Sequence, residues 1–354
     1  MTMQKQSLQK RLFVFLLLFS SLCHTPLTAE ETGMGLYLLG YQSAKAGYLP
    51  PPGLYFRNDA YHHPGHIKGA VFGGIAQLKA NAKISLDLLT LTYVSPLKFL
   101  GADVACGVLV PFGRINVHAS AQIQVAPLIQ ALESSIPSSG AASTPSAAAS
   151  TSTPTPPALP TTITKKKHQV AHGISDMLVI PLMLGWHWDN FHMLAYQGLF
   201  LPTGRYKKGR IANMGQNHYA TETDAGITYL NKNTGTELSL ISGLTVNFTN
   251  HKIHYRSGTG WHTEFFAGQY LTRGLEVGLA GYWFYQLTKD SGKGALLGGF
   301  RGRVLGLGPC LSYDFKIKNF EFNANVRYYK ESHAKHYLKG ESFWFTLSIP
   351  IFTN

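Results

Sequence analysis

Apolar and polar residues alternate over several segments of this chain. Between residues 320 and 328 every even position is apolar, and every odd position carries a polar Glu, Asn or Arg. Residues 342–351 nearly repeat the pattern, with Trp344 as the exception, and residues 237–248 do so with a break at Ser242. A period of two is typical of β-strands that have one apolar face and one polar face.

The length of these runs favours strands that cross a membrane. They last about 9 to 12 residues, whereas strands of soluble proteins usually have about 5–6. A strand tilted through a bilayer needs about 9–11 residues. We therefore predict twelve strands, within a range of 10–14, at 53–61, 85–95, 102–115, 174–187, 191–201, 220–230, 236–247, 259–269, 275–287, 304–315, 320–330 and 341–352.

The connections between these segments alternate in length. Short ones fall at 96–101, 188–190, 231–235, 270–274 and 316–319, and the intervening ones are longer. Outer-membrane barrels have an even number of strands, short periplasmic turns and long outer loops. The predicted fold class is therefore all-β, an antiparallel transmembrane outer-membrane β-barrel with both termini on the periplasmic side.

The composition agrees with a barrel in lipid. Charged residues are 14% of the chain and aromatic residues 12%, compared with about 25% charged residues in soluble domains. The aromatic residues gather near the predicted strand ends, as in the girdles of membrane barrels. No stretch after the N-terminus is long and apolar enough for a membrane helix.

The first 29 residues resemble a secretory signal peptide. Positive residues come first (Lys5, Lys10 and Arg11), an apolar run follows at 12–19, and a small-residue exit lies at 27–29. We predict cleavage after residue 29 and a single barrel domain over 30–354, located in the bacterial outer membrane.

Residues 127–168 differ from the rest of the chain. Pro, Ala, Ser and Thr dominate 137–160, and Lys165, Lys166 and Lys167 follow. Such a stretch buries too little apolar area to fold by itself. An interdomain linker is one interpretation, and the strand parity favours a disordered insertion in one outer loop.

Charge and possible chemistry narrow the partners. The chain carries a formal net charge of +13, which suits anionic lipopolysaccharide. For an exported barrel we predict no nucleic-acid partner. Most of the histidine groups fall in predicted outer loops, so we predict no metal site. The sequence has no local catalytic motif, and we predict no catalytic residue, no cofactor and no enzymatic activity.

The alternation also predicts which charged residues face the lumen. They could set the field of a pore, hold a plug, or pair with one another in a packed polar interior. These candidates are Arg57, Asp59, Asp87, Glu222, Asp224, Glu237, Glu264, Glu276, Arg303, Asp314, Glu321 and Arg327.

Three consecutive prolines stand before the first predicted strand. Proline fixes φ and has no N–H to donate to a neighbouring strand. Residues 48–53 therefore form either a stiff lead into the strand, which we favour, or a short plug in the lumen.

Several short sequence segments resemble those of a known outer-membrane family labelled "putative MetA-pathway of phenol degradation", also called SphA-like or transporter. They are GYLPPPGLYFRND at 47–59, LPTGRY at 201–206, YRSG at 255–258 and GRVLGLGP at 302–309. The resemblance covers about 33–352 without the low-complexity insertion. One departure is the C-terminus, which ends in Thr353 and Asn354 after Phe352.

The resemblance implies a passive channel or transporter for small hydrophobic or aromatic compounds. A structural or surface-interaction barrel without an open pore, and a barrel enzyme that acts on lipids, are the alternatives. The expected partners are outer-membrane lipid and lipopolysaccharide, a small hydrophobic or aromatic solute, and the barrel-assembly machinery.

Overall fold

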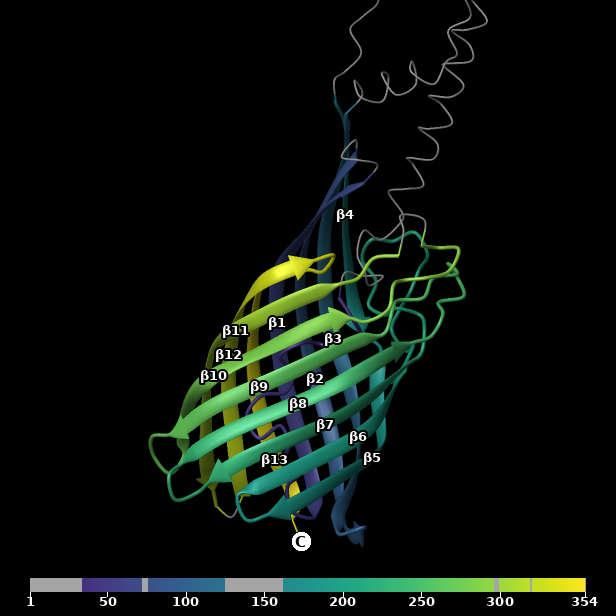
Figure 1. Ribbon diagram of the computed structural model, residues 1–354. Coiled ribbons are helices and arrows are strands. Elements are labelled where there is room, and N and C mark those ends of the chain that lie inside the picture. The colour runs from purple at the N-terminus through teal and green to yellow at the C-terminus, as the bar shows by residue number, and fades with distance from the viewer. Residues whose placement is uncertain (1–33, 72–75, 125–161, 296–298, 319, 354) are drawn as a thin grey trace, which may run out of the picture.

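Twelve antiparallel strand positions close into a barrel (Figure 1). The computed structural model describes residues 34–71, 76–124, 162–295, 299–318 and 320–353. Its strands are β1 (Gly53–Val71), β2 (Ala76–Phe99), β3 (Ala102–Gln124), β4 (Thr162–Ile174), β5 (Met177–Trp188), β6 (Phe191–Leu201), β7 (Ala220–Asn231), β8 (Thr236–Asn247), β9 (Gly260–Tyr270), β10 (Leu275–Gln286), β11 (Arg303–Ile317), β12 (Phe320–Lys335) and β13 (Lys339–Thr353).

Sequential strands pair around the wall, and β1 closes the barrel by pairing with both β2 and β13. One position in the wall is shared by two strands. The part of β3 over 103–109 pairs with β5, and the part over 112–124 pairs with β4. Strands β4 and β5 therefore lie end to end along β3, with a break at Ser175 and Asp176. Together they occupy one position, so the wall has twelve positions as predicted.

The barrel has one end with five short turns, as the alternation predicts, and the opposite end carries longer connections. The predicted long connection at 331–340 is wrong, because only residues 336–338 lie between β12 and β13. The turn end carries the short connections between β2 and β3, β5 and β6, β7 and β8, β9 and β10, and β11 and β12. The loop end carries residues 202–219, 248–259, 287–295 and 299–302. Every predicted segment overlaps a different wall position, so the predicted fold class is confirmed.

Four strands continue well beyond the barrel at the loop end (Figure 1). We call this part the extension: residues 62–71, 76–85, 113–124 and 162–173. The sequence analysis expected loops at 62–84 and 116–173, between its predicted strands. In the structure the described parts of these stretches pair as strands. Backbone hydrogen bonds hold an antiparallel ladder together, and they form whatever the polarity of the side chains.

The predicted disordered insertion at 127–168 is partly corrected by β4. Residues 162–168 pair in register with residues 118–124 of β3. The rest of the predicted insertion, 127–161, and the predicted signal peptide, 1–29, lie outside the described residues.

Apolar side chains cover much of the outer surface of the barrel. On β8 the outward Leu238, Leu240 and Leu244 are exposed, while the inward Ile241 and Glu237 are buried. An outward apolar band of this kind is the surface that a membrane barrel presents to lipid. Within the described residues, no helix is long and apolar enough to cross a membrane.

We expect Leu240→Arg to destabilise the folded barrel by about 2–4 kcal/mol, because Leu240 lies midway along β8 and the substitution would place a charge in hydrocarbon. Denaturant unfolding in phospholipid vesicles measures the effect, with Leu240→Ala as the control for lost side-chain volume. Equal stability of the two variants would show that this face does not contact lipid.

Candidate functional site

The N-terminal segment before β1 lies inside the barrel, where Figure 1 shows it threading behind the strands. We call residues 34–50 the plug. Tyr37, Leu39, Tyr41 and Leu49 of the plug are all buried. The favoured interpretation of residues 48–53 as only a lead into β1 is therefore incomplete, since the chain just before the prolines fills part of the lumen.

Two buried acids bind the backbone of the plug. The N–H groups of Gly40 and Gln42 donate to the two carboxylate oxygens of Glu264, each at 2.7 Å. The N–H of Lys45 donates to Glu237, and the N–H of Gly47 donates to Thr228 Oγ1 at 2.9 Å. The plug has little regular structure, so these side chains of β7, β8 and β9 satisfy N–H groups that no neighbouring strand reaches.

Two further contacts hold the plug, one from Arg57 of β1 and one between Lys45 of the plug and Asp314 of β11. Arg57 forms two 2.8 Å contacts with the carboxylate of Asp59 and donates from Nη2 to the carbonyl of Tyr41 at 2.7 Å. The Lys45 ammonium of the plug lies 2.9 Å from Asp314. Burial alone would lower the pKa of Lys45, but the Asp314 carboxylate more than offsets this, and the pKa lies above its ordinary value.

Glycines let the plug approach the wall closely. A Cβ on Gly47 would lie 2.6 Å from the backbone of Ile227 and Thr228. A Cβ on Gly40, which has a φ of +86°, would lie 2.8 Å from the ring of Tyr329. Any larger residue at these two positions would push the plug away from the acids that bind it.

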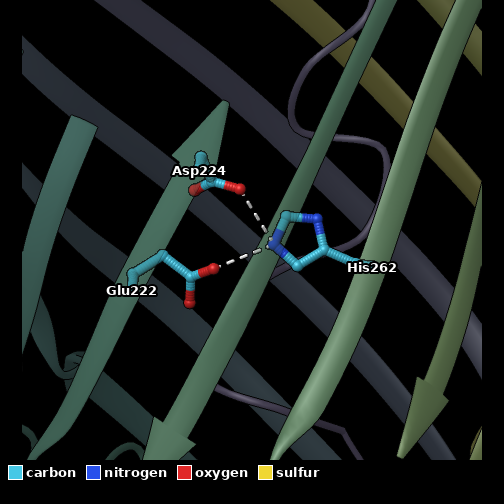
Figure 2. Close-up of side chains that lie close together, drawn as sticks. All are labelled: Glu222, Asp224 and His262. Carbon is cyan, nitrogen blue, oxygen red and sulfur yellow. Dashed lines mark hydrogen bonds and ion pairs between the residues drawn. The ribbon is translucent and has the colours of Figure 1, made fainter. Parts of the chain in front are cut away.

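Three side chains converge beneath the plug (Figure 2). His262 Nε2 lies 2.8 Å from Glu222 Oε1 and 3.2 Å from Asp224 Oδ1. All three are nearly fully buried, and the ring of Tyr37 stacks on the imidazole with centroids 3.7 Å apart. We call Glu222, Asp224 and His262 the triad.

The register of three strands places the triad. Asp224 on β7 is paired with Gly243 on β8, which is paired with His262 on β9. A Cβ on Gly243 would lie 1.7 Å from Asp224 Oδ1 and 2.6 Å from His262 Nε2. The missing side chain on β8 is thus what lets Asp224 and His262 meet across that strand.

The triad is also the set of described residues whose donor atoms could hold a metal ion, since its ligand atoms lie within 4.8 Å of one another. One imidazole nitrogen and two carboxylate oxygens suit a divalent cation such as Zn²⁺. The sequence analysis predicted no metal site and overlooked His262, because residues distant in sequence form the cluster.

The lumen has two chemically different halves. The inward residues of β7 to β13 and of β1 are largely polar or aromatic and contact the plug. The inward residues of β2 to β6 are largely apolar, including Leu86, Leu88, Leu109, Leu178 and Ile180. The plug is anchored to the polar half and leaves space along the apolar half.

That space is a cavity of about 1950 Å³. Its lining includes Leu86, Leu88 and Ile180 of the wall, together with Leu36 and Leu38 of the plug. The lining extends from the turns at 231–235 and 271–274 to loop residues 211–216, so the cavity runs along much of the lumen.

The structure places most of the predicted lumen residues on the inner face and in the polar half. Glu321 has inward parity but is exposed at the mouth of the turn end, where it pairs with Lys316 at 2.6 Å. The remaining residues on this side are Arg57, Asp59, Glu222, Asp224, Glu237, Glu264, Glu276, Asp314 and Arg327.

Two predicted lumen residues point outward instead. Asp87 lies between the buried Leu86 and Leu88 of β2, so its side chain is on the opposite face. Arg303 is exposed and precedes the buried Val304 of β11. Both errors arose because a polar residue was assumed to avoid the outer face, although Asp87 lies beside the extension and Arg303 begins β11 at the loop end.

Sequence reasoning also missed the apolar half. The signal was present, because residues 84–94 of β2 carry apolar side chains on both faces. A strand that is apolar on both faces is buried on both, or meets lipid on one and an apolar interior on the other.

We expect Glu264→Ala to loosen the plug. The substitution removes the acceptor of two charge-assisted hydrogen bonds, each contributing about 1.5–3 kcal/mol. Hydrogen exchange at the amides of residues 34–46 should accelerate at least about tenfold. The control is Glu321→Ala, an acid exposed at the mouth, and equal exchange in both variants would contradict the anchoring role of Glu264.

We expect His262→Ala to destabilise the barrel by about 1–3 kcal/mol, since it leaves two buried acid side chains without the imidazole that they share. Denaturant unfolding in vesicles measures the loss. His192→Ala is the matched control, because His192 is a buried histidine of the lumen that contacts no acid among the described residues. A similar cost in both variants would argue against a role for the shared contact.

Comparison with known proteins gives a family and a fold. The profile of the family described as "Putative MetA-pathway of phenol degradation" matches residues 68–347. No curated protein shows a significant match to the sequence. The chain is similar in structure to the COG4313 outer membrane channel from Pseudomonas putida F1, with a TM-score of 0.56 and 13% identity over 89% of this chain and 98% of that one.

Two further barrels align with lower scores. A FadL homologue from Pseudomonas aeruginosa has a TM-score of 0.40 and 8% identity over 87% of this chain and 92% of its own. The TodX deltaS2S3 mutant monoaromatic hydrocarbon channel has a TM-score of 0.37 and 11% identity over 86% and 91%. The similarity to the COG4313 channel is the one that supports a shared fold.

Proposed function

The chain belongs to the family described as "Putative MetA-pathway of phenol degradation", and from this premise we propose that it is a passive outer-membrane channel for small hydrophobic or aromatic compounds. The cavity beside the plug, which is apolar along β2 to β6 and polar where Arg57, Asp314 and Arg327 line it, is the observation that carries this proposal. The outer-membrane channel from Pseudomonas putida F1, which has the same fold, adds support for transport.

The lining of the cavity suits such a solute. Leu86, Leu88, Leu178 and Ile180 present apolar side chains to it, and transfer of apolar surface from water to such a wall is favourable. A volume of about 1950 Å³ exceeds the roughly 300–1,000 Å³ of ordinary ligand pockets. The space therefore suits a pathway better than a single binding site.

The charged half of the lumen has a different role in this proposal. Glu264, Glu237 and Arg57 form hydrogen bonds with the backbone of the plug. They therefore position the plug so that it narrows the lumen without filling the apolar half, and of the three only Arg57 lines the cavity.

The proposal includes outer-membrane location and the partners expected from the sequence: membrane lipid, lipopolysaccharide and the barrel-assembly machinery. It includes no catalytic step. A barrel that serves only surface interactions is the second candidate, favoured by the extension, which projects beyond the loop end.

We expect cells that display this protein in their outer membrane to take up phenol faster than cells without it, with no change for glucose. Leu88→Gln should remove most of the increase, because a buried amide on the cavity wall costs roughly 1–3 kcal/mol. Uptake of radiolabelled phenol measures the rate.

The matched control is Leu89→Gln, the neighbouring residue on the outer face of β2. Heat-modifiable mobility on gels shows that each variant forms a barrel. A folded wild-type protein that gives no increase in phenol uptake, or an equal loss in both variants, would contradict the proposed path.

A further inference from the structure

The outer face of the extension carries a cationic surface. Alternation along β1 to β4 places one set of side chains on the same outward face as the exposed Leu91 and Tyr93 of β2. We call this set the basic ladder. All of its members are exposed: Lys68, Lys79, Lys83, Arg114 and Lys166, with His62, His66, His118, His168 and His172.

The strand register arranges the basic ladder in rows. Lys68 is paired with Lys79, Lys79 with Ser120, and Ser120 with Lys166. The next outward row toward the barrel contains His118 and His168, whose rings stack with centroids 3.9 Å apart. A further row brings Arg114 beside His172. The rows span about 20 Å along the strands.

No acid balances these charges on the extension. None of the described residues over 62–71, 76–86, 113–124 and 162–174 is Asp or Glu. The nearest acid on the same outer face is Asp87 of β2, one row below Arg114, and Glu341 on the adjoining β13 stands opposite Lys330 of β12 in the register. No member of the basic ladder forms an ion pair with any other described residue.

Such an arrangement is unfavourable for the isolated sheet. Like charges placed directly opposite, as Lys68 and Lys79 are, destabilise a strand pair. Four strands with uncompensated cations on one face therefore gain stability from an anionic partner that lies along them.

The position of the basic ladder identifies that partner. On β3 and β4 the row directly below it contains Phe112 and Ile174, paired with 39% and 53% of their surfaces exposed, and on β2 the same row contains Asp87. On β3 and β4 the outer face thus changes from apolar to cationic over one row. In a membrane this step falls where hydrocarbon meets charged headgroups.

We propose that the basic ladder binds the phosphate groups of lipopolysaccharide, the anionic glycolipid of the outer leaflet. The inference rests on the outer-membrane placement in the proposed function and not on transport. A barrel that passes no phenol can therefore still bind this lipid. Failure of the transport proposal and failure of lipopolysaccharide binding are thus distinguishable.

The test measures binding of lipid A to the full-length barrel in detergent. The variant Lys79→Gln, Lys83→Gln, Arg114→Gln removes three cations from the basic ladder, and Arg114 and Lys83 lie in the two rows nearest Phe112. The control Lys165→Gln, Lys207→Gln, Lys208→Gln removes three exposed cations elsewhere at the loop end, including the sequence neighbour of Lys166 on the opposite face. Both variants have the same net charge.

We expect wild type and control to bind bis-phosphorylated lipid A with similar affinity, and more tightly than dephosphorylated lipid A. The ladder variant should bind about a hundredfold more weakly, at roughly fivefold for each cation, and added salt should reduce the difference. Should the triple variant not form a barrel, the single pair Lys79→Gln and Lys165→Gln tests the same contrast.

Three results would overturn the proposal. Dephosphorylated lipid A could bind as tightly as the phosphorylated form. The control variant could lose as much affinity as the ladder variant, which would make net charge the cause. Millimolar inorganic phosphate could displace lipid A completely, which would indicate a site for small anions.

Discussion

The structure depends on one constraint, which is that every backbone N–H and C=O in a bilayer needs a partner within the protein. Closure of β1 onto β13 and β2 supplies those partners around the whole wall. Closure also forces alternate residues inward, so each strand delivers half of its side chains to a narrow interior. The lumen chemistry follows from what those inward positions carry.

The side chains buried in the two halves of the lumen differ in whether they need hydrogen-bond partners. In the polar half, carboxylates such as Glu264 and Glu237 are buried and need donors, and the backbone of the plug supplies them. In the apolar half, β2 to β6 present Leu and Ile, which need no partner. An anchored plug and an open apolar cavity are thus consequences of one uneven distribution of residues around the wall.

The outer face changes with height for a related reason. Along β3 and β4 the outward residues change from Phe112 and Ile174 to Arg114 and His172 within one row. The same strands that meet lipid in the barrel continue into the extension, where backbone pairing persists and the side chains are cationic. The plug, the cavity and the basic ladder therefore occupy separate surfaces of one continuous sheet.

The sequence by itself determined the barrel, because a period of two and alternating connections depend only on neighbours along the chain. It also predicted most of the inward charges, with Asp87 and Arg303 as errors. Only the tertiary structure decided that the plug fills the polar half, that Gly243 lets Asp224 reach His262, and that Lys68, Lys79 and Lys166 share a row. These features require the register between strands, which residue order along one strand does not contain.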